Sequence, residues 1–210
     1  MEKKEVFAIL IVIVLMSLII LLNEKSLNFL WITIISALII LASVFCKKLT
    51  AKIINIKIEH KIWLLQRWWI GKSSYLKNPI PTGIIIPAIF SLISVPCFSF
   101  LQFESKALPA KAVKNYGSKR FSEITEWDLC MIGFYGILGP LLLSIIAKII
   151  PFSLPGVNLM LLSQYSLYYA LWNLLPVSNL DGAKMFFGSS RLYIFTLIIT
   201  TITGLIVFLA

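Results

Sequence analysis

The stretch Asn173-Leu174-Leu175-Pro176-Val177-Ser178-Asn179-Leu180-Asp181-Gly182 ends a long apolar run of the chain. It brings an amide, a helix-breaking proline, a carboxylate and a glycine together at the end of that run. Such groups are costly inside a bilayer, and an intramembrane polar residue is a functional candidate by default. Pro176 cannot donate to the carbonyl of Trp172, which we therefore expect to be left free. The simplest structural role for Asp181 is to cap a short helix over residues 183–187.

The composition is that of an integral membrane protein. The chain is 59% hydrophobic and only 13% charged, with a mean hydropathy of +0.93, whereas average soluble domains are about a quarter charged. Its net charge of +10 comes from lysines and arginines that cluster between apolar runs. That clustering is typical of positive-inside topology and does not indicate nucleic-acid binding. The three cysteines are far apart and predict neither a disulfide framework nor a zinc knuckle.

The apolar runs predict an all-α polytopic membrane protein with about five transmembrane helices, over residues 6–22, 27–46, 129–150, 157–177 and 192–210. A further apolar segment, 83–103, contains Pro87 and Pro96 and is expected to be re-entrant or broken by proline. If this segment returns to its own side, nearly all lysines and arginines lie on the side of the N-terminus. If it spans, they divide almost evenly, so the positive-inside bias favours a return.

The chain therefore divides into three regions. Residues 1–46 form an N-terminal transmembrane hairpin. Residues 47–128 form a basic cytosolic or interfacial region that includes segment 83–103, and residues 129–210 form the C-terminal transmembrane helices. In the middle region, residues 54–59 alternate with period two and predict a short strand, while 62–70 mixes tryptophan with basic residues and is expected on the membrane surface.

Small residues in the run 129–150 predict a helix-packing face, because they allow helix backbones to approach closely. These residues are Gly133, Gly136, Gly139 and Pro140.

The spacing Asn173-x-x-Pro176-x-x-x-Leu180-Asp181-Gly182 resembles the second motif of the site-2 protease family of intramembrane zinc metalloproteases. The resemblance covers roughly residues 27–190, and its specific evidence lies at 173–182, with Gly139-Pro140 resembling the family's Ala-Gly-Pro element. It implies that Asp181 corresponds to a zinc ligand and that two histidines of a His-Glu-x-x-His helix would be the others. The chain contains one histidine, His60, so that first motif cannot be complete.

Two placements of the incomplete motif are possible. One sets Ser43 and Lys47 at the histidine positions and Val44 at the glutamate. The other sets His60 at the second histidine, Ile56 at the first and Lys57 at the glutamate. The second is preferred because it keeps one ligand and because the basic run after it suits the cytosolic end of a helix. In either placement the site is broken, since a catalytic zinc needs three protein ligands and a base for its water.

We therefore expect a non-catalytic relative of the site-2 proteases that lies in the cell membrane with its N-terminus in the cytoplasm. It would be no enzyme and have no cofactor, and its partners would be the lipid bilayer and transmembrane segments of other proteins. One alternative is an active intramembrane zinc metalloprotease with atypical ligands, in which His60 and Asp181 hold the metal. The other is a small transporter or lipid-binding protein that uses segment 83–103.

Overall fold

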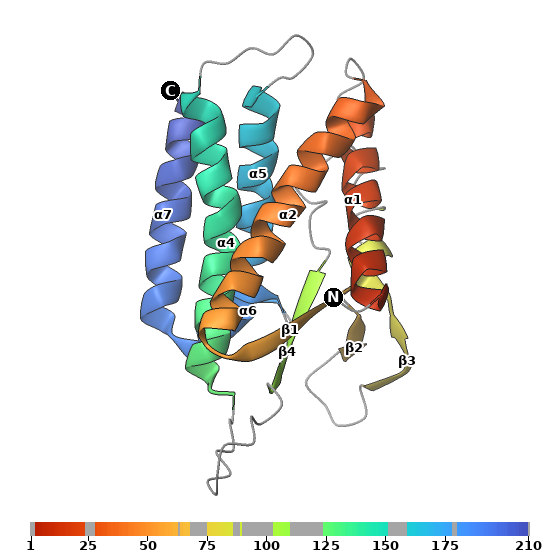
Figure 1. Cartoon of the computed structure of the whole chain (residues 1–210). Helices are drawn as coiled ribbons and strands as arrows, with labels where there is room; N and C mark the ends of the chain where they lie inside the picture. Colours follow the sequence, from red (N-terminus) through yellow and green to blue (C-terminus); the bar gives the residue numbers. More distant parts are fainter. Residues whose placement is uncertain are drawn as a thin grey trace, which may run out of the picture.

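The computed structural model describes residues 3–23, 28–62, 64–67, 75–85, 89, 103–109, 124–150, 159–177 and 180–209. Within these ranges the chain is predominantly helical. The helices with labels in Figure 1 are α1 (Lys3–Asn23), α2 (Phe29–Ile53), α4 (Glu126–Ile149), α5 (Leu159–Leu174), α6 (Asp181–Gly188) and α7 (Ser190–Leu209). Four of them, α1, α2, α4 and α7, are long and apolar enough to cross a membrane. Helices of this length and composition support the prediction of a membrane protein, whereas the count of about five transmembrane helices plus a re-entrant segment stays a prediction.

The long helices run alternately up and down the bundle (Figure 1). The second of them, α2, crosses diagonally between α1 and α4, and it continues past the predicted end at Cys46 to Ile53. Asn55, just beyond it, has a φ of 61°. This is the left-handed conformation in which helices commonly end, and asparagine tolerates it better than most residues. The extra length of α2 carries its last lysines to the end of the bundle where the strands lie.

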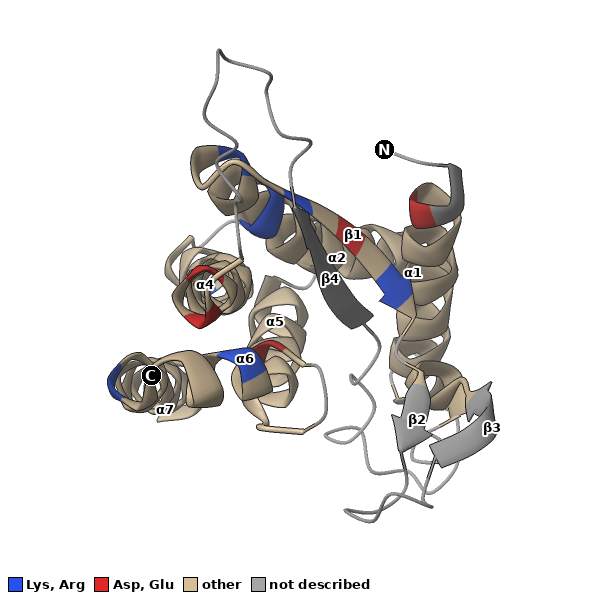
Figure 2. Cartoon of the chain, turned by 90° about the horizontal axis from the view of Figure 1, so that it is seen from below, with Lys and Arg blue, Asp and Glu red and all other residues tan. Residues whose placement is uncertain are grey.

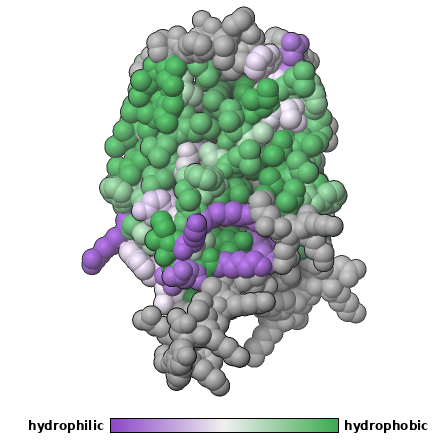
Figure 3. All heavy atoms as spheres, in the orientation of Figure 1, coloured by the Kyte–Doolittle hydropathy of each residue, from purple (hydrophilic) through white to green (hydrophobic). Residues whose placement is uncertain are grey.

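On the face shown in Figure 3 an apolar belt covers the helices, and hydrophilic residues gather below it at one end. Viewed from that end, charged residues lie on the ends of α1, α2, α4 and α7 and on α6 and β1 (Figure 2). This division is the one expected of a bundle whose side chains face lipid along its length and water at its end.

Two small sheets lie at the charged end, in addition to the predicted helices. β1 (Ile56–Ile62) pairs antiparallel with β4 (Phe103–Pro109), and β2 (Leu65–Arg67) pairs with β3 (Tyr75–Ile80). β1 confirms the short strand predicted near residues 54–59. Of the expected surface segment 62–70 only part is described, and segment 83–103 lies almost wholly outside the described residues.

The pairing of β1 with β4 follows from the alternation of its side chains. Ile58 and His60 are buried, whereas Lys57 and Lys61 point outward beside Glu59. The backbone register places residue 106 of β4 opposite Glu59 and residue 104 opposite Lys61. A shift of β1 by one residue would expose its apolar face, so the alternation of its side chains favours this register.

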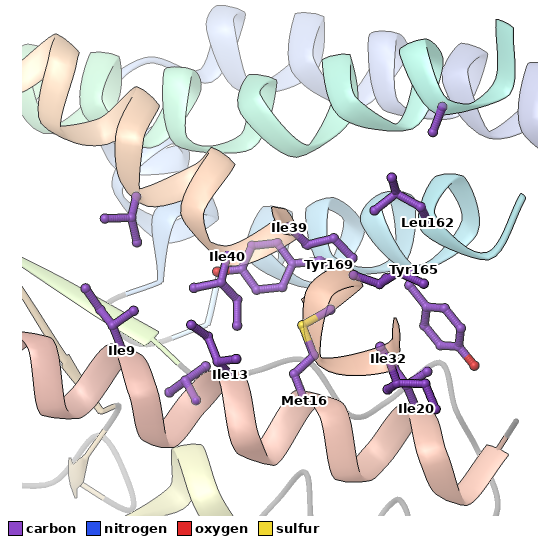
Figure 4. Packing of buried hydrophobic residues seen from close by; sticks show 14 residues of the cluster. Ile9, Ile13, Met16, Ile20, Ile32, Ile39, Ile40, Leu162, Tyr165 and Tyr169 are labelled. Carbon is purple, nitrogen blue, oxygen red and sulfur yellow. The ribbon is translucent and has the colours of Figure 1, made fainter. Parts of the chain in front are cut away.

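The largest core cluster joins α1 and α2 to α5 (Figure 4). Isoleucines of α1 and α2 pack around Met16 and meet the rings of Tyr165 and Tyr169 from α5. Because Met16 is flexible and unbranched, it fills the irregular space between branched side chains.

The glycine face of α4 is confirmed as a packing face. A Cβ added at Gly139 would lie 2.8 Å from the carbonyl oxygen of Ala42 in α2, and one at Gly133 would lie 2.9 Å from the carbonyl oxygen of Asp181 in α6. Both distances are shorter than real Cβ contacts, so these positions need glycine to let α2 and α6 approach.

Candidate functional site: a buried lysine–aspartate pair

Asp181 is the first residue of α6 and is 2% exposed. Its carboxylate forms an ion pair with the ammonium of Lys47, which is 1% exposed. The Lys184 ammonium lies 3.7 Å from the other carboxylate oxygen. The short helix predicted after Asp181 is present, but Leu180 is its N-cap residue and no side chain caps it. The Asp181 side chain therefore pairs with lysine where a capping role was expected.

The Lys47 side chain reaches Asp181 across α4 at Gly136. A Cβ at Gly136 would lie 2.3 Å from Cε and 2.8 Å from Cγ of Lys47. The missing side chain of this glycine therefore makes room for the aliphatic part of the lysine. A long cationic side chain can in this way cross a packed helix interface while its charged end meets a carboxylate.

Ser43, one helical turn before Lys47, compensates for a proline in α4. Pro140 has no N–H, so the carbonyl of Gly136 loses its helical donor. The Ser43 hydroxyl donates to that carbonyl at 2.9 Å, and both groups are buried. A buried carbonyl without a donor would be costly, so Ser43 and Pro140 form a matched pair across the α2–α4 interface.

Tyr169 and Asn173 of α5 complete the polar surroundings. The Tyr169 side chain hydrogen-bonds with the side chains of Ser43 and Asn173. It also interacts electrostatically with the Lys47 ammonium. Asn173 also donates to the Tyr169 carbonyl at 2.8 Å. The Asn173 amide is thus engaged within the bundle.

The helix break after α5 differs from expectation in one respect. The Trp172 carbonyl was predicted to be free because Pro176 cannot donate to it, but the backbone N–H of Leu175 donates to it at 3.2 Å. The chain compensates for the proline with a tighter last turn, as helix ends often do. Gly182 then packs directly on the end of α5, since a Cβ there would lie 2.0 Å from the Leu174 carbonyl oxygen.

His60 lies in a second cluster, with partners different from those of Asp181. Its Nδ1 is 3.0 Å from Glu5 of α1, and the Lys48 ammonium lies 2.8 Å from the same oxygen of Glu5. Burial, followed by the positive charge of Lys47, lowers the pKa of His60 to about 4 despite the favourable contact with Glu5. The imidazole is therefore neutral near pH 7, and because a carboxylate can only accept, Nδ1 is the donor.

The local structure corrects the preferred placement of the incomplete motif. Residues 56 and 60 lie in strand β1, where four residues span about 13 Å, so side chains at these positions cannot share one metal ion. Glu59 points to the opposite face from His60 and contacts Lys57 and Lys61. The alternative placement lies on helix α2 instead, with Lys47 in contact with Asp181.

The residues around Asp181 do not fit a zinc ion. The ammonium groups of Lys47 and Lys184 lie beside the Asp181 carboxylate, and ammonium groups repel a cation. Zinc in proteins is bound by cysteine, histidine and carboxylate groups, and the described residues contain no cluster of three such side chains. His60 and Asp181, the two candidate ligands, are each engaged elsewhere.

Sequence reasoning identified Lys47 only as a residue that replaces a ligand, and it did not foresee that Lys47 pairs with Asp181. The available signal was the first of two adjacent lysines, four residues after Ser43, at the end of a run that is otherwise long and apolar. Glu5 and Lys48 were not identified at all. Comparison with family models, with curated proteins and with solved structures found no match to this chain.

Proposed function

We propose that this chain is a non-catalytic membrane protein with a site-2 protease-like arrangement, in which a lysine holds the aspartate that would otherwise bind zinc. The observation that carries the proposal is the buried ion pair between Lys47 and Asp181. Ser43, Val44 and Lys47 are spaced on α2 as the residues of a His-Glu-x-x-His motif are. Residues 43 and 47 share one helical face, and residue 47 meets the aspartate of the second motif.

The role that fits this arrangement is the binding or scaffolding of membrane segments of other proteins. After Leu174 the described residues 175–177 are not helical, and Val177 among them is 42% exposed. Irregular backbone at membrane depth is tolerated where protein or a cavity surrounds it, so an approaching transmembrane segment could complete this surface. The ion pair would keep α6 against α2 while the partner binds.

The proposed topology has five crossings, by α1, α2, α4, α5 and α7, with segment 83–103 returning to its own side. β4 pairs with β1 along its whole length, and β1 directly follows α2. The chain therefore leaves β3 and re-enters at β4 at the same end of the bundle (Figure 1). The gathering of described lysines at this end supports a cytoplasmic location for it and for the N-terminus of a cell-membrane protein.

Placing the missing zinc ligands on α2 tests whether α2 corresponds to the zinc-binding helix of the site-2 proteases. The triple variant Ser43→His/Val44→Glu/Lys47→His puts the missing groups on α2 beside Asp181. We expect the purified variant to hold about one zinc ion per chain and to lose it when Asp181→Ala is added. The matched control is Ile56→His/Lys57→Glu, which restores the other placement around His60 and is expected to bind no stoichiometric zinc. Metal content is measured on protein that elutes as a single species.

Two outcomes contradict the proposal. If the unaltered chain itself retains about one zinc ion that Asp181→Ala removes, the site is a metal centre and the lysine pairing is not its resting state. If the β1 variant binds zinc and the α2 variant does not, the correspondence between α2 and the family's zinc helix fails.

A further inference from the structure

The rings of Phe186, Phe187 and Tyr193 pack together on α6 and the beginning of α7, and the exposed Trp127 lies in the first turn of α4, next in the chain to Glu126, which Gly188 of α6 contacts. We call these four residues the α6 aromatic cluster. Phe187 is 74% exposed, Trp127 51% and Phe186 45%. The Phe186 ring packs edge-on against those of Phe187 and Tyr193, with ring centroids 5.5 Å apart in each case. Such a group of exposed rings on an ordered helix needs an apolar or amphipathic covering.

The end of α6 is fixed at the level of the first turn of α4. A Cβ at Gly188 would lie 2.5 Å from the carbonyl oxygen of Glu126. Phe187 and Trp127 are the chain neighbours of these two contacting residues. The exposed rings on the two helices therefore lie at one level along the bundle.

That level is the boundary between the charged end and the apolar belt. The first turn of α4 carries an exposed capping box in which Thr125 and Asp128 cap each other, an arrangement suited to water. Arg191, in the first turn of α7, is also exposed. On the face shown in Figure 3, the surface above the charged end is mainly apolar. Aromatic rings flanked by charges on one side and apolar surface on the other are typical of the headgroup region of a bilayer.

The Lys47–Asp181 ion pair lies farther along α4. The Asp181 backbone packs against Gly133, seven residues after Glu126, and the Lys47 side chain packs against Gly136, ten residues after it. At about 1.5 Å per residue these contacts lie about 10 Å and about 15 Å from the level of Glu126. The pair is thus separated from the aromatic cluster by two to three helical turns of α4.

We infer that the α6 aromatic cluster docks in the lipid headgroup region and so holds the Lys47–Asp181 pair about 10–15 Å deeper, within the hydrocarbon layer. The inference rests on the membrane character of the bundle and is independent of the proposed function. The covering that the rings require is the bilayer itself, because the apolar belt above them is continuous with the exposed faces of the membrane-crossing helices. α6 acts as a surface anchor, and the ion pair is an intramembrane charge pair.

Depth measurement with nitroxide labels on single cysteines tests this inference. The native cysteines are replaced, and labels are placed in separate variants of the full chain in phospholipid nanodiscs. Positions 187 and 127 report the cluster on its two helices. Tyr135, which is 40% exposed and lies between Gly133 and Gly136, reports the level of the ion pair. Lys61, exposed on β1, serves as the aqueous reference.

Relaxation by lipid-soluble oxygen and by a water-soluble nickel complex gives the depth of each label. We expect labels at 187 and 127 to lie near the phosphate level and the label at 135 to lie about 10–15 Å deeper. Water accessibility at 187 and 127 equal to that at 61 overturns the inference, because the cluster is then outside the bilayer. A label at 187 shielded from both reagents overturns it as well, because protein then covers the rings. Equal depths at 187 and 135 overturn the placement of the ion pair.

Discussion

Lys47 and Lys48 are adjacent in α2, yet their ammonium groups meet acids from opposite halves of the chain. Lys47 pairs with Asp181 of α6, whereas Lys48 reaches Glu5 in the first turn of α1. Neighbouring residues on a helix point about 100° apart. One turn of α2 therefore forms ion pairs with both the N-terminal and the C-terminal half of the chain, at one end of the bundle. This division explains why His60, which shares Glu5 with Lys48, is not available to Asp181.

The pairing of Lys47 also has an energetic consequence at the residue scale. Removing one member of a buried ion pair leaves an uncompensated charge and typically costs about 3–5 kcal/mol, whereas replacing both members can be nearly neutral. The stability of the bundle should therefore depend on the two residues jointly. Lys184, at 3.7 Å and 12% exposed, contributes much less to Asp181 because the contact is longer and partly hydrated.

At the scale of the elements, α4 organises the site through its small residues. Its glycines admit α2, α6 and the Lys47 side chain, and its proline is compensated by Ser43. Reciprocal bonds between Ser144 and Ser163, each donating to the other's carbonyl at 2.8 Å, hold α4 to α5. The sequence was sufficient to predict the packing face, because small residues at helical spacing have few other uses in a membrane span.

Gly182 provides the sharpest test of the junction between α5 and α6. Gly182→Ala places a methyl group 2.0 Å from the Leu174 carbonyl oxygen and 2.7 Å from that of Leu175. Backbone atoms cannot yield as a flexible side chain can, so we expect a loss of about 3 kcal/mol in the free energy of unfolding. The matched control is Gly204→Ala, where the nearest heavy atom is a Leu167 methyl at 3.8 Å.

Unfolding in mixed micelles of mild detergent and dodecyl sulfate measures both glycine variants. The control should stay within about 0.5 kcal/mol of the unaltered chain. A Gly182→Ala variant as stable as the control would show that α6 does not pack on the end of α5 as described.

For the whole molecule, the amino-acid pattern predicted the helices well and the site poorly. Long apolar runs determine membrane-crossing helices because the bilayer leaves the backbone few alternatives. The end of α2 at Ile53 was missed because Lys47, which marks the end of the apolar run, is buried by a partner 134 positions later in the chain. The pairing of β1 with β4 likewise joins segments that are far apart in the sequence. Local composition identifies neither Asp181 as the partner of Lys47 nor β4 as the partner of β1.

The topology of the whole chain has a direct test in labelling by a membrane-impermeant thiol reagent. If segment 83–103 returns to its own side, single cysteines at Lys61 and Arg191 react from the same side of the membrane, and one at Ile150 reacts from the other. Residue 61 precedes the segment, and residue 191 follows it after two further crossings of the proposed topology, by α4 and α5. Reaction of 61 and 191 from opposite sides would mean that the segment spans.

The central claim is that the Lys47 ammonium holds the Asp181 carboxylate in the interior of the bundle, and a double-mutant cycle tests it most directly. The free energy of unfolding is measured for the unaltered chain, Lys47→Met, Asp181→Asn and the double variant, with Lys184→Met as the control cation. We expect each single change at the pair to cost about 3 kcal/mol, the double change to cost clearly less than their sum, and a coupling energy of at least about 2 kcal/mol. Additive losses within about 0.5 kcal/mol, or a larger coupling of Asp181 to Lys184 than to Lys47, would contradict the claim.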